Sequence, residues 1–374
     1  MHLADLPTPS VLVERARLLD NINRMQAAAT ARGLRLRPHG KTHKIPMIAR
    51  WQLDAGAVGI TLAKVGEAEV FANAGIQDIR LAYPIPPTTS PRLLALMNRA
   101  RMSIVVDHPT VASAWSQAMQ TGGQVLDVLV KVDVGYHRCG IDPVGPNAIE
   151  FISEIIQLPG LRFRGLLSHA GHGYNVSTET ALGEIASAEA KMLTQLAEAT
   201  RAHNINVDEV SVGATPTVRY SLDQTGLTEL RPGTYVFGDL TQIALGATTV
   251  GNCALSVLAT VVSAPTPDRF ILDAGSKTLS SDAARGPLPA LGYGAICTDL
   301  TAAEIAPGFI IDRLSEEHGV VEVAHGRPAL QPGDRVRVIP NHACVVTNLA
   351  DAVRLTDGDA VLETLPVAAR GKNS

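Results

Sequence analysis

Between residues 10 and 240 the chain alternates short aliphatic runs with longer stretches of helical periodicity, and no other feature limits its possible folds as strongly. An apolar run followed by an amphipathic stretch is the pattern of a strand and its crossover helix. The predicted strands are residues 34–38, 59–61, 79–82, 103–106, 126–132, 163–168, 209–212 and 229–231. The predicted helices are residues 15–32, 45–55, 65–74, 91–100, 111–120, 148–157, 178–203 and, briefly, 217–222.

Eight strands, each followed by a crossover, is the number that closes a parallel barrel. The competing architecture is an open doubly wound sheet, which commonly carries a glycine-rich turn after its first strand. Here the first predicted strand leads into His39-Gly40-Lys41, and no G-x-G-x-x-G pattern lies nearby. The sequence therefore predicts the α/β class, with an eight-stranded (β/α) TIM-type barrel over residues 1–248.

After about residue 245 the alternation of strand and helix patterns gives way to a mainly β pattern. Residues 254–263, 269–274, 320–324 and 335–340 are β-rich runs, and few long helical patterns remain. The segment Gln331-Pro332-Gly333-Asp334 is a strong turn signal before the last run. We predict a second, mainly β C-terminal domain over residues 249–374, with the first residues of the chain as candidates to pair with it.

Composition argues against several classes of function. The 374 residues carry a net charge of −4, so no basic surface argues for a nucleic-acid partner. We expect neither a secretory signal nor a membrane partner, because the N-terminus lacks a basic stretch followed by an apolar one and no apolar run could span a bilayer. The four cysteines are scattered without a C-x-x-C pair, which is typical of the reducing cytoplasm.

The C-terminal ends of the barrel strands are where this fold places an active site. The polar residues that follow the predicted strands are rich in histidine and arginine rather than in the serine, asparagine and glutamate usual in loops. They are His39, Lys41, Tyr83, Asp107, His108, Asp133, Tyr136, His137, Arg138, Ser168, His169, His172, Tyr174, Thr215, Thr217, Arg231, Thr234 and Tyr235.

Lys41 is the candidate with the most specific surroundings. It lies in a segment crowded with other basic residues, namely Arg37, His39, His43 and Lys44. Like charge and partial desolvation both lower the pKa of an amine. A neutral amine can attack an aldehyde, which is the reaction that attaches pyridoxal phosphate to a protein. The alternative interpretation is a solvated basic loop.

Two small-residue loops follow the last two predicted strands. Gly213-Ala214-Thr215-Pro216-Thr217 comes after one, and Pro232-Gly233-Thr234-Tyr235 comes after the other. Barrels of this kind commonly hold phosphate at that place. Small residues let backbone N–H groups converge on an anion, and hydroxyl groups add donors. Either loop alone could be an ordinary tight turn, but the two together favour a phosphate clamp.

An H-x-C pair, His342 and Cys344, follows the last β-rich run. On an extended segment residues two apart point to the same side, so this pair could offer a nitrogen and a thiolate to one ion. The alternative is a buried histidine and an inert cysteine. The segment Glu316-Glu317-His318-Gly319 could add a polar group near the ion, or could equally be an exposed turn.

Taken in order, the motifs resemble a known family. They are Pro38-His39-Gly40-Lys41-Thr42-His43-Lys44, Asp133-Val134-Gly135-Tyr136-His137-Arg138-Cys139-Gly140, Ser168-His169-Ala170-Gly171-His172, the two small-residue loops with Arg231, Glu316-Glu317-His318-Gly319 and Pro340-Asn341-His342-Ala343-Cys344. Together they resemble the metal-activated, pyridoxal-phosphate-dependent D-serine dehydratase and D-threonine aldolase family, which has the fold type of alanine racemase. The resemblance covers essentially the whole chain.

This resemblance implies a role for individual residues. Lys41 would bind the cofactor covalently, Arg138 would contact its phenolic oxygen, and His169 would lie against the pyridine ring. Arg231 matches an arginine near the pyridine nitrogen. The phosphate would be held by Gly213, Ala214, Thr215, Gly233 and Thr234, with Tyr235 as a further candidate. His342 and Cys344 match the two metal ligands.

The resemblance further implies a lyase that acts on a D-3-hydroxy amino acid and forms a homodimer. Aldolase members tend to carry His-x-Asp at the metal pair and dehydratase members His-x-Cys, so Cys344 favours a D-serine or D-threo-3-hydroxyaspartate dehydratase. A thiolate with an imidazole also favours zinc over Mn or Mg. D-threonine aldolase activity, racemase activity and a non-catalytic pyridoxal-phosphate carrier remain alternatives, although such a carrier usually consists of the barrel alone.

Overall fold

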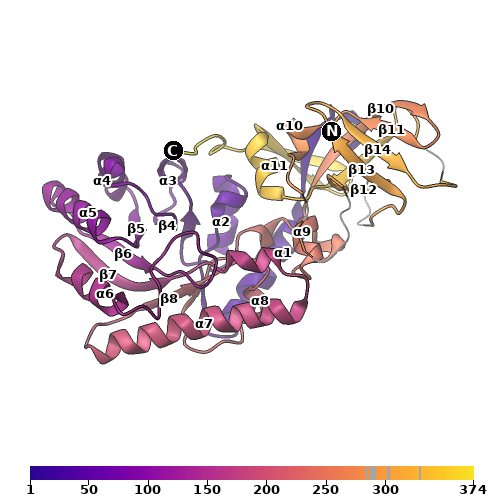
Figure 1. Cartoon of the computed structure of the whole chain (residues 1–374). Coiled ribbons are helices and arrows are strands. Elements are labelled where there is room, and N and C mark those ends of the chain that lie inside the picture. The colour runs from indigo at the N-terminus through magenta and orange to yellow at the C-terminus, as the bar shows by residue number, and fades with distance from the viewer. Residues whose placement is uncertain (284, 287–291, 301–303, 328–329) are drawn as a thin grey trace.

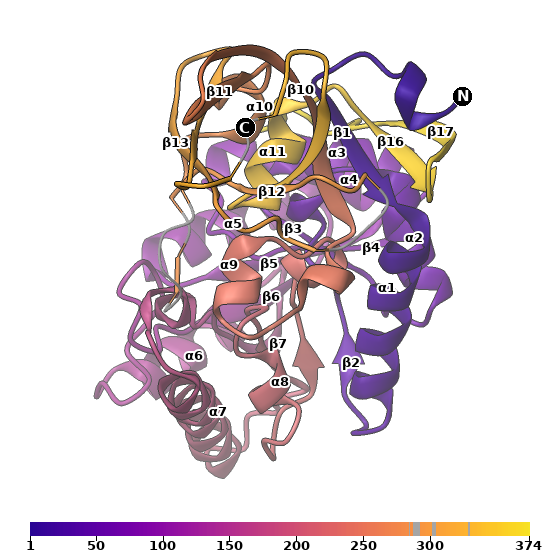
Figure 2. The ribbon, with the colours of Figure 1, turned by 90° about the vertical axis from the view of Figure 1, so that its right-hand side faces the viewer.

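Two sheets lie at the two ends of an elongated molecule in the computed structural model, which describes residues 1–283, 285–286, 292–300, 304–327 and 330–374 (Figure 1). The barrel occupies one end, and the orange and yellow β domain occupies the other. In Figure 2 the first strand and α1 run as one indigo segment from the β domain down to the barrel.

The barrel consists of eight parallel strands, all within the fully described residues 35–230. They are β2 (Arg35–Leu36), β3 (Ile60–Leu62), β4 (Asp78–Leu81), β5 (Arg101–Val106), β6 (Leu126–Lys131), β7 (Leu161–Leu167), β8 (Glu209–Val212) and β9 (Glu229–Leu230), in the order β2-β9-β8-β7-β6-β5-β4-β3. The edge strands β2 and β3 meet through a parallel bridge between His39 and Thr61, and Thr61 N donates to Pro38 O at 2.8 Å. The predicted α/β barrel is confirmed.

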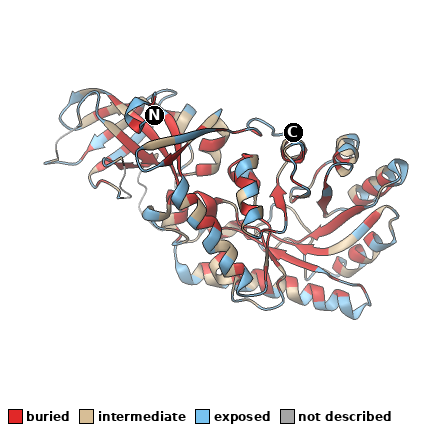
Figure 3. Ribbon diagram, turned by 180° about the vertical axis from the view of Figure 1, so that it is seen from behind, coloured by how far each residue is buried: buried red, intermediate tan, exposed pale blue. Residues whose placement is uncertain are grey.

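Helices cover the outside of the barrel and turn their buried faces toward the strands (Figure 3). They are α1 (Arg15–Thr30), α2 (Pro46–Asp54), α3 (Val65–Asn73), α4 (Ser90–Met97), α5 (Pro109–Gly122), α6 (Ala148–Gln157), α7 (Glu179–Ala202) and α8 (Val218–Ser221), whereas the short α9 (Leu240–Ala244) packs against the β domain. Their ends follow the sequence: α5 begins at Pro109 and stops at Gly123, which adopts a left-handed φ of 63°. Short 3-10 turns fill several strand-to-helix loops, including η2 (Gly40–Thr42), η4 (Gly171–Asn175) and η5 (Thr234–Val236).

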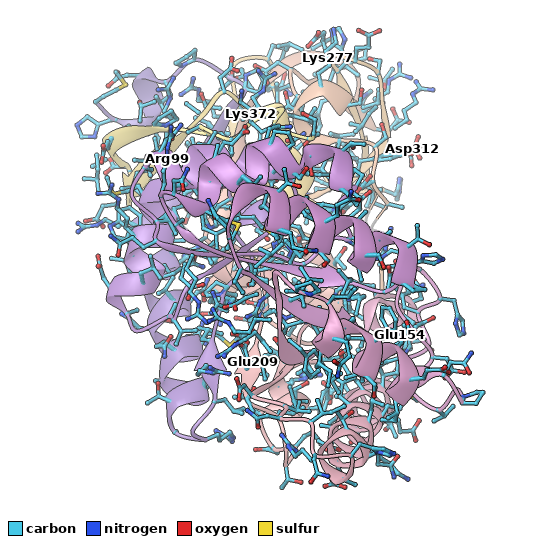
Figure 4. All side chains as sticks on the ribbon, turned by 90° about the vertical axis from the view of Figure 1, so that its left-hand side faces the viewer. Arg99, Glu154, Glu209, Lys277, Asp312 and Lys372 are labelled. Carbon is cyan, nitrogen blue, oxygen red and sulfur yellow. The ribbon has the colours of Figure 1, made fainter. Side chains whose placement is uncertain are left out.

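The inside of the barrel carries a buried network of paired charges below the site. Arg80 forms ion pairs with Glu229 and, at 2.7 Å, with Glu209, which Figure 4 labels. Arg37 Nε donates to Glu229 at 2.9 Å. Ser211 Oγ then donates to Glu229 at 2.7 Å and accepts from Arg231 Nε at 2.7 Å. The network therefore runs from the middle of the barrel up to Arg231.

The β domain is a mixed sheet that takes one strand from the N-terminus. Its strands are β1 (Ser10–Glu14), β10 (Leu255–Thr266), β11 (Arg269–Leu272), β12 (Ala295–Cys297), β13 (Phe309–Leu314), β14 (Gly319–Val323), β15 (Arg335–Ile339), β16 (Ala352–Asp357) and β17 (Ala360–Pro366), and its helices are α10 (Ser276–Leu279) and α11 (Ala343–Leu349). Strand β1 pairs antiparallel with β10 and parallel with β16. The predicted mainly β second domain is therefore present, and the N-terminal strand completes it.

None of the helices in the described parts of the chain is both long and apolar enough to cross a bilayer. All four cysteines are free.

Candidate active site

Lys41 lies on η2, directly after the His39–Thr61 bridge that closes the barrel. The side chain is exposed to solvent inside a cavity at the C-terminal ends of the strands, with protein atoms around it. Removal from bulk water, opposed by the Cys344 thiolate and reinforced by Arg138, lowers its pKa. The amine therefore gives up its proton more readily than a free lysine.

One cavity collects almost all of the predicted cofactor residues. Its lining includes Lys41, Arg138, His169, Gly213, Ala214, Thr215, Arg231, Gly233 and Thr234, together with His39, Thr42, Ala82, Lys131 and Tyr174. A second cavity shares Lys41, Arg138, His169, Tyr174 and Thr234 with the first, and continues to His342 and Cys344. The predicted cofactor residues and the predicted metal pair therefore border one continuous site.

His169 has a defined protonation state. Its Nδ1 lies 2.7 Å from the carbonyl oxygen of Gly213, which can only accept, so Nδ1 carries the hydrogen. Burial and the neighbouring Lys41 and Lys131 hold the pKa of His169 well below its usual value. The ring is thus neutral, with Nε2 unprotonated, which suits a group packed against an aromatic cofactor ring.

The two small-residue loops approach other backbone closely. A Cβ atom on Gly213 would stand 2.8 Å from Arg231 N, and one on Gly233 would stand 2.6 Å from Thr42 Oγ1. Gly233 N also lies within donating distance of Thr215 Oγ1, at 3.3 Å. Such a cradle of small residues and hydroxyl groups fits a phosphate.

Tyr235 differs from its neighbours, because its side chain points away from the cavity. Its hydroxyl group accepts a hydrogen bond from Gln52 Nε2 at 3.0 Å, and the side chain is buried. The residue lies on η5, where a tight turn sends adjacent side chains in different directions. The expectation that this hydroxyl group contacts phosphate is therefore not supported.

His342 and Cys344 meet, although not by the geometry expected for an extended segment. His342 is the extended N-cap of α11, and Cys344 lies in the first turn of that helix. His342 Nδ1 donates to Asp282 Oδ2 at 2.7 Å, which leaves Nε2 free for the site. Cys344 Sγ lies 3.4 Å from Thr42 Oγ1 and 3.6 Å from Thr234 Oγ1.

These two side chains favour each other's charged forms, imidazolium for His342 and thiolate for Cys344. Burial alone would lower the pKa of His342, but the Cys344 thiolate and nearby acidic groups raise it to about 10. Burial would raise the pKa of Cys344, but the charged His342 lowers it. A thiolate and an imidazole are the donors that a borderline-soft cation prefers, so the pair fits a divalent metal. Within the described residues, no third His, Cys, Asp or Glu completes a metal cluster, so other ligands must come from elsewhere.

The Glu316–Glu317 segment lies away from this site. Lys277 Nζ pairs with Glu316 at 2.7 Å and with Glu317 at 2.8 Å, all three side chains being exposed. Figure 4 shows Lys277 at the outer edge of the β domain. Of the two interpretations of this segment, the exposed turn is the one that the structure supports.

The structure adds site residues that the sequence interpretation did not select. Lys131, at the end of β6, lines the cofactor cavity, and burial lowers its pKa to about 7. Asp239 accepts from Gln242 N at 2.9 Å and from Ala343 N at 3.0 Å, so one carboxylate caps both α9 and α11. Asp282 and Arg285 border the cavity near His342. The position of Lys131 on an alternating strand could have indicated it, but the other three depend on how the two domains meet.

Comparisons with known proteins place the chain in a family. The family described as alanine racemase, N-terminal domain, matches residues 13–241, and a serine dehydratase domain family matches residues 254–356. The D-threo-3-hydroxyaspartate dehydratase of Delftia sp. (strain HT23) is 35% identical over 97% of both chains. The chain belongs to the D-serine dehydratase and D-threonine aldolase family.

Two further members of the family agree with this assignment. The D-threonine aldolase of an Arthrobacter species is 34% identical over 99% of this chain and 94% of its own length. The solved structure of the Delftia dehydratase superposes with a TM-score of 0.91, at 34% identity over 98% of each chain. The family resemblance that the motifs predicted, and the fold type that it implied, are confirmed.

Proposed function

We propose that this chain is a pyridoxal-phosphate- and divalent-metal-dependent lyase that converts a D-3-hydroxy amino acid into a keto acid and ammonia. D-threo-3-hydroxyaspartate or D-serine is the proposed substrate. The observation that carries the proposal is the continuous cavity bordered by Lys41 and by the His342–Cys344 pair. The dehydratases and aldolase among its relatives support the same reaction class.

Each group would be held by residues that fit it. Lys41 would attach the cofactor's aldehyde carbon, the loops at Gly213 and Gly233 would hold its phosphate, and His342 and Cys344 would hold the ion. Arg138, His169 and Arg231 would surround the ring. When bound, the cofactor accepts the electron pair released at Cα and the metal makes the substrate hydroxyl group a better leaving group.

The protein's own groups would move the protons. Lys41 Nζ, whose lowered pKa makes the neutral form accessible, would take the proton from Cα. Burial raises the pKa of Tyr174, so its hydroxyl group stays protonated in the cavity and can donate to a substrate oxygen. The neutral His169 would exclude water from one side of the ring without competing for the α-proton.

The aldolase is the second candidate. In that reaction the Cα–Cβ bond breaks and glycine and an aldehyde are released. The relatives do not separate the two reactions, because a dehydratase at 35% and an aldolase at 34% are almost equally similar. Cys344 favours dehydration, because dehydratase members of the family tend to carry His-x-Cys at the metal pair and aldolase members His-x-Asp; a thiolate also pairs better with zinc than with the harder Mn or Mg. A racemase would need a second base on the other face of the ring and no metal.

Incubation of the purified protein with each D-3-hydroxy amino acid tests the proposal. We expect keto acid and ammonia from D-threo-3-hydroxyaspartate or D-serine, and loss of this activity on chelation with recovery on adding zinc. Cys344→Ala should retain the yellow colour of the bound cofactor while losing about 10²-fold or more in metal-dependent turnover. Glycine plus aldehyde would assign the aldolase reaction, and activity that survives chelation would remove the metal from the mechanism.

The cellular setting is part of the same proposal. Four free cysteines, one of them the proposed metal ligand Cys344, suit a reducing compartment, which supports a cytoplasmic location. A homodimer is proposed from the family, and sedimentation of the purified protein measures it.

A further inference from the structure

Lys44 occupies an unusual position three residues after Lys41. It is 5% exposed, and its φ of 54° is in the left-handed region that non-glycine residues seldom adopt. Such a conformation persists only where the surrounding contacts hold it. No role in the chemistry proposed above accounts for a buried lysine at this place.

The Lys44 ammonium group is fully satisfied by three oxygen atoms. Its Nζ lies 2.8 Å from Asn348 Oδ1, 2.9 Å from Asn373 Oδ1 and 3.2 Å from Glu67 Oε1. An ammonium group has three hydrogens to donate, so each has one acceptor. The second Glu67 oxygen accepts from Ala63 N and Lys64 N, which fixes that carboxylate at the start of α3.

The three acceptors belong to different parts of the molecule. Glu67 lies on α3 of the barrel, and Asn348 lies on α11 of the β domain, one helical turn after Cys344. Asn373 lies in the C-terminal segment, which Figure 1 shows returning from the β domain to α3. That segment also contacts the Lys44 backbone, since Ala369 N donates to Lys44 O at 3.1 Å.

Two contacts therefore connect the Lys41 segment to α11, side by side. One joins Thr42 Oγ1 to Cys344 Sγ at 3.4 Å, and the other joins Lys44 to Asn348. Because Cys344 and Asn348 are four residues apart on a helix, they lie on one face of it. The second contact is the stronger, since a buried ammonium–oxygen hydrogen bond is charge-assisted.

We infer that Lys44 is a positioning residue that holds α11 against the Lys41 segment and so sets the place of the Cys344 thiolate relative to the Lys41 amine. The inference rests on the proposed metal-dependent function. In this role the second lysine of the Lys41–Lys44 motif connects the barrel half of the site to the β-domain half.

The most specific test removes the hydrogen bond between Lys44 and α11 by changing Asn348. Asn348→Ala leaves the Lys44–Glu67 pair intact, so the fold is retained, whereas Lys44→Met would leave a buried carboxylate without its partner. We expect Asn348→Ala to weaken zinc binding ~10-fold, as measured by chelator competition, because groups that orient metal ligands usually contribute that much. The absorbance of the bound cofactor should not change.

Two matched variants separate this role from general stabilisation. Asn348→Asp keeps an oxygen acceptor and should bind zinc within about two-fold of wild type, as expected for an intact second contact. Asn373→Ala removes a different acceptor from the same ammonium group but leaves α11 attached, so its zinc affinity should also stay near wild type while its melting temperature falls. Equal zinc affinity in Asn348→Ala and wild type would overturn the inference.

The proposed function can fail separately from this inference. If wild type and Cys344→Ala bind zinc equally, then Cys344 is not a ligand and the metal assignment fails. If Cys344→Ala loses zinc but Asn348→Ala does not, only the role of Lys44 fails.

Discussion

The buried charge network inside the barrel, here called the barrel floor, and the cavity above it use the same kinds of residue in opposite ways. In the floor, Arg37 and Arg80 are paired with Glu229 and Glu209, and the hydrogen bonds between them are complete. In the cavity, the exposed Lys41 and the buried Lys131 lie beside other cations, and among the described residues no carboxylate is bonded to either amine. Paired buried charges stabilise the fold, whereas a cation without a carboxylate partner in a cavity is available to bind a ligand such as an anion or an aldehyde.

The strongest test of this contrast is Lys41→Ala. We expect a colourless protein whose turnover falls by ~10³-fold or more, because one amine both attaches the cofactor and moves the α-proton. Lys191→Ala, at an exposed lysine on α7, is the control. Borohydride reduction and peptide mapping should place the label on the peptide that contains residue 41, and a yellow Lys41→Ala protein would show that another lysine binds the cofactor.

Substitutions in the barrel floor should instead lower the free energy of unfolding. Glu229→Gln leaves Arg37 and Arg80 short of a buried counter-charge, so we expect a loss of about 3–5 kcal/mol in the free energy of unfolding. Urea denaturation measures this loss, with Glu154→Gln on the exposed face of α6 as the matched control. A variant as stable as wild type would mean that the floor charges are not held together by their pairing.

The charge on Lys131 should make the stability of the cofactor-free protein depend on pH. Burial first, then Arg231, lowers its pKa from 10.5 to about 7 in the fold. Between these values the unfolded chain holds a proton that the folded chain does not, so this residue lowers stability increasingly as the pH falls from 10.5 to 7. Lys131→Met should therefore stabilise the protein at pH 7 more than at pH 9.5, by on the order of 2 kcal/mol in urea titrations. A pH-independent difference would contradict a buried, unpaired amine.

The smallest expected effect is at Tyr235. Because its hydroxyl group bonds to Gln52 and not to the cavity, Tyr235→Phe should cost about 1 kcal/mol of stability and leave the affinity for pyridoxal phosphate unchanged. A marked loss of cofactor affinity, with stability preserved, would show that this hydroxyl group contacts the phosphate after all.

The barrel could be predicted from the sequence more completely than the β domain. Each predicted barrel strand exists, because short β-branched or aliphatic runs alternate regularly with amphipathic helical stretches along this part of the chain. The first residues were expected to pair with the β domain, which β1 does, but the strand Ser10–Glu14 itself was not placed, because its partners β10 and β16 lie hundreds of residues away in sequence. Strand β13 was also missed, since charged residues interrupt its apolar pattern.

The site shows the same division. Lys41, the phosphate loops and His342–Cys344 could be recognised as local motifs. The roles of Asp239 and Asn348 could not, because each depends on a contact between the barrel and the β domain that no local pattern records. Tyr235 shows the converse: it belongs to a local motif, yet a turn of the backbone directs its side chain elsewhere.

The barrel closes at the His39–Thr61 bridge, immediately before the turn that carries Lys41. A seam held by so few hydrogen bonds is where thermal opening should begin. A cofactor attached at residue 41 and anchored by its phosphate to the loops after β8 and β9 would tie the ends of β2, β9 and β8 together and hold η2 in place beside that seam. Because η2 packs against β3, loss of the vitamin-derived cofactor would free that turn, and the amide hydrogen of Thr61 should exchange with deuterium faster in the empty protein than in the loaded one.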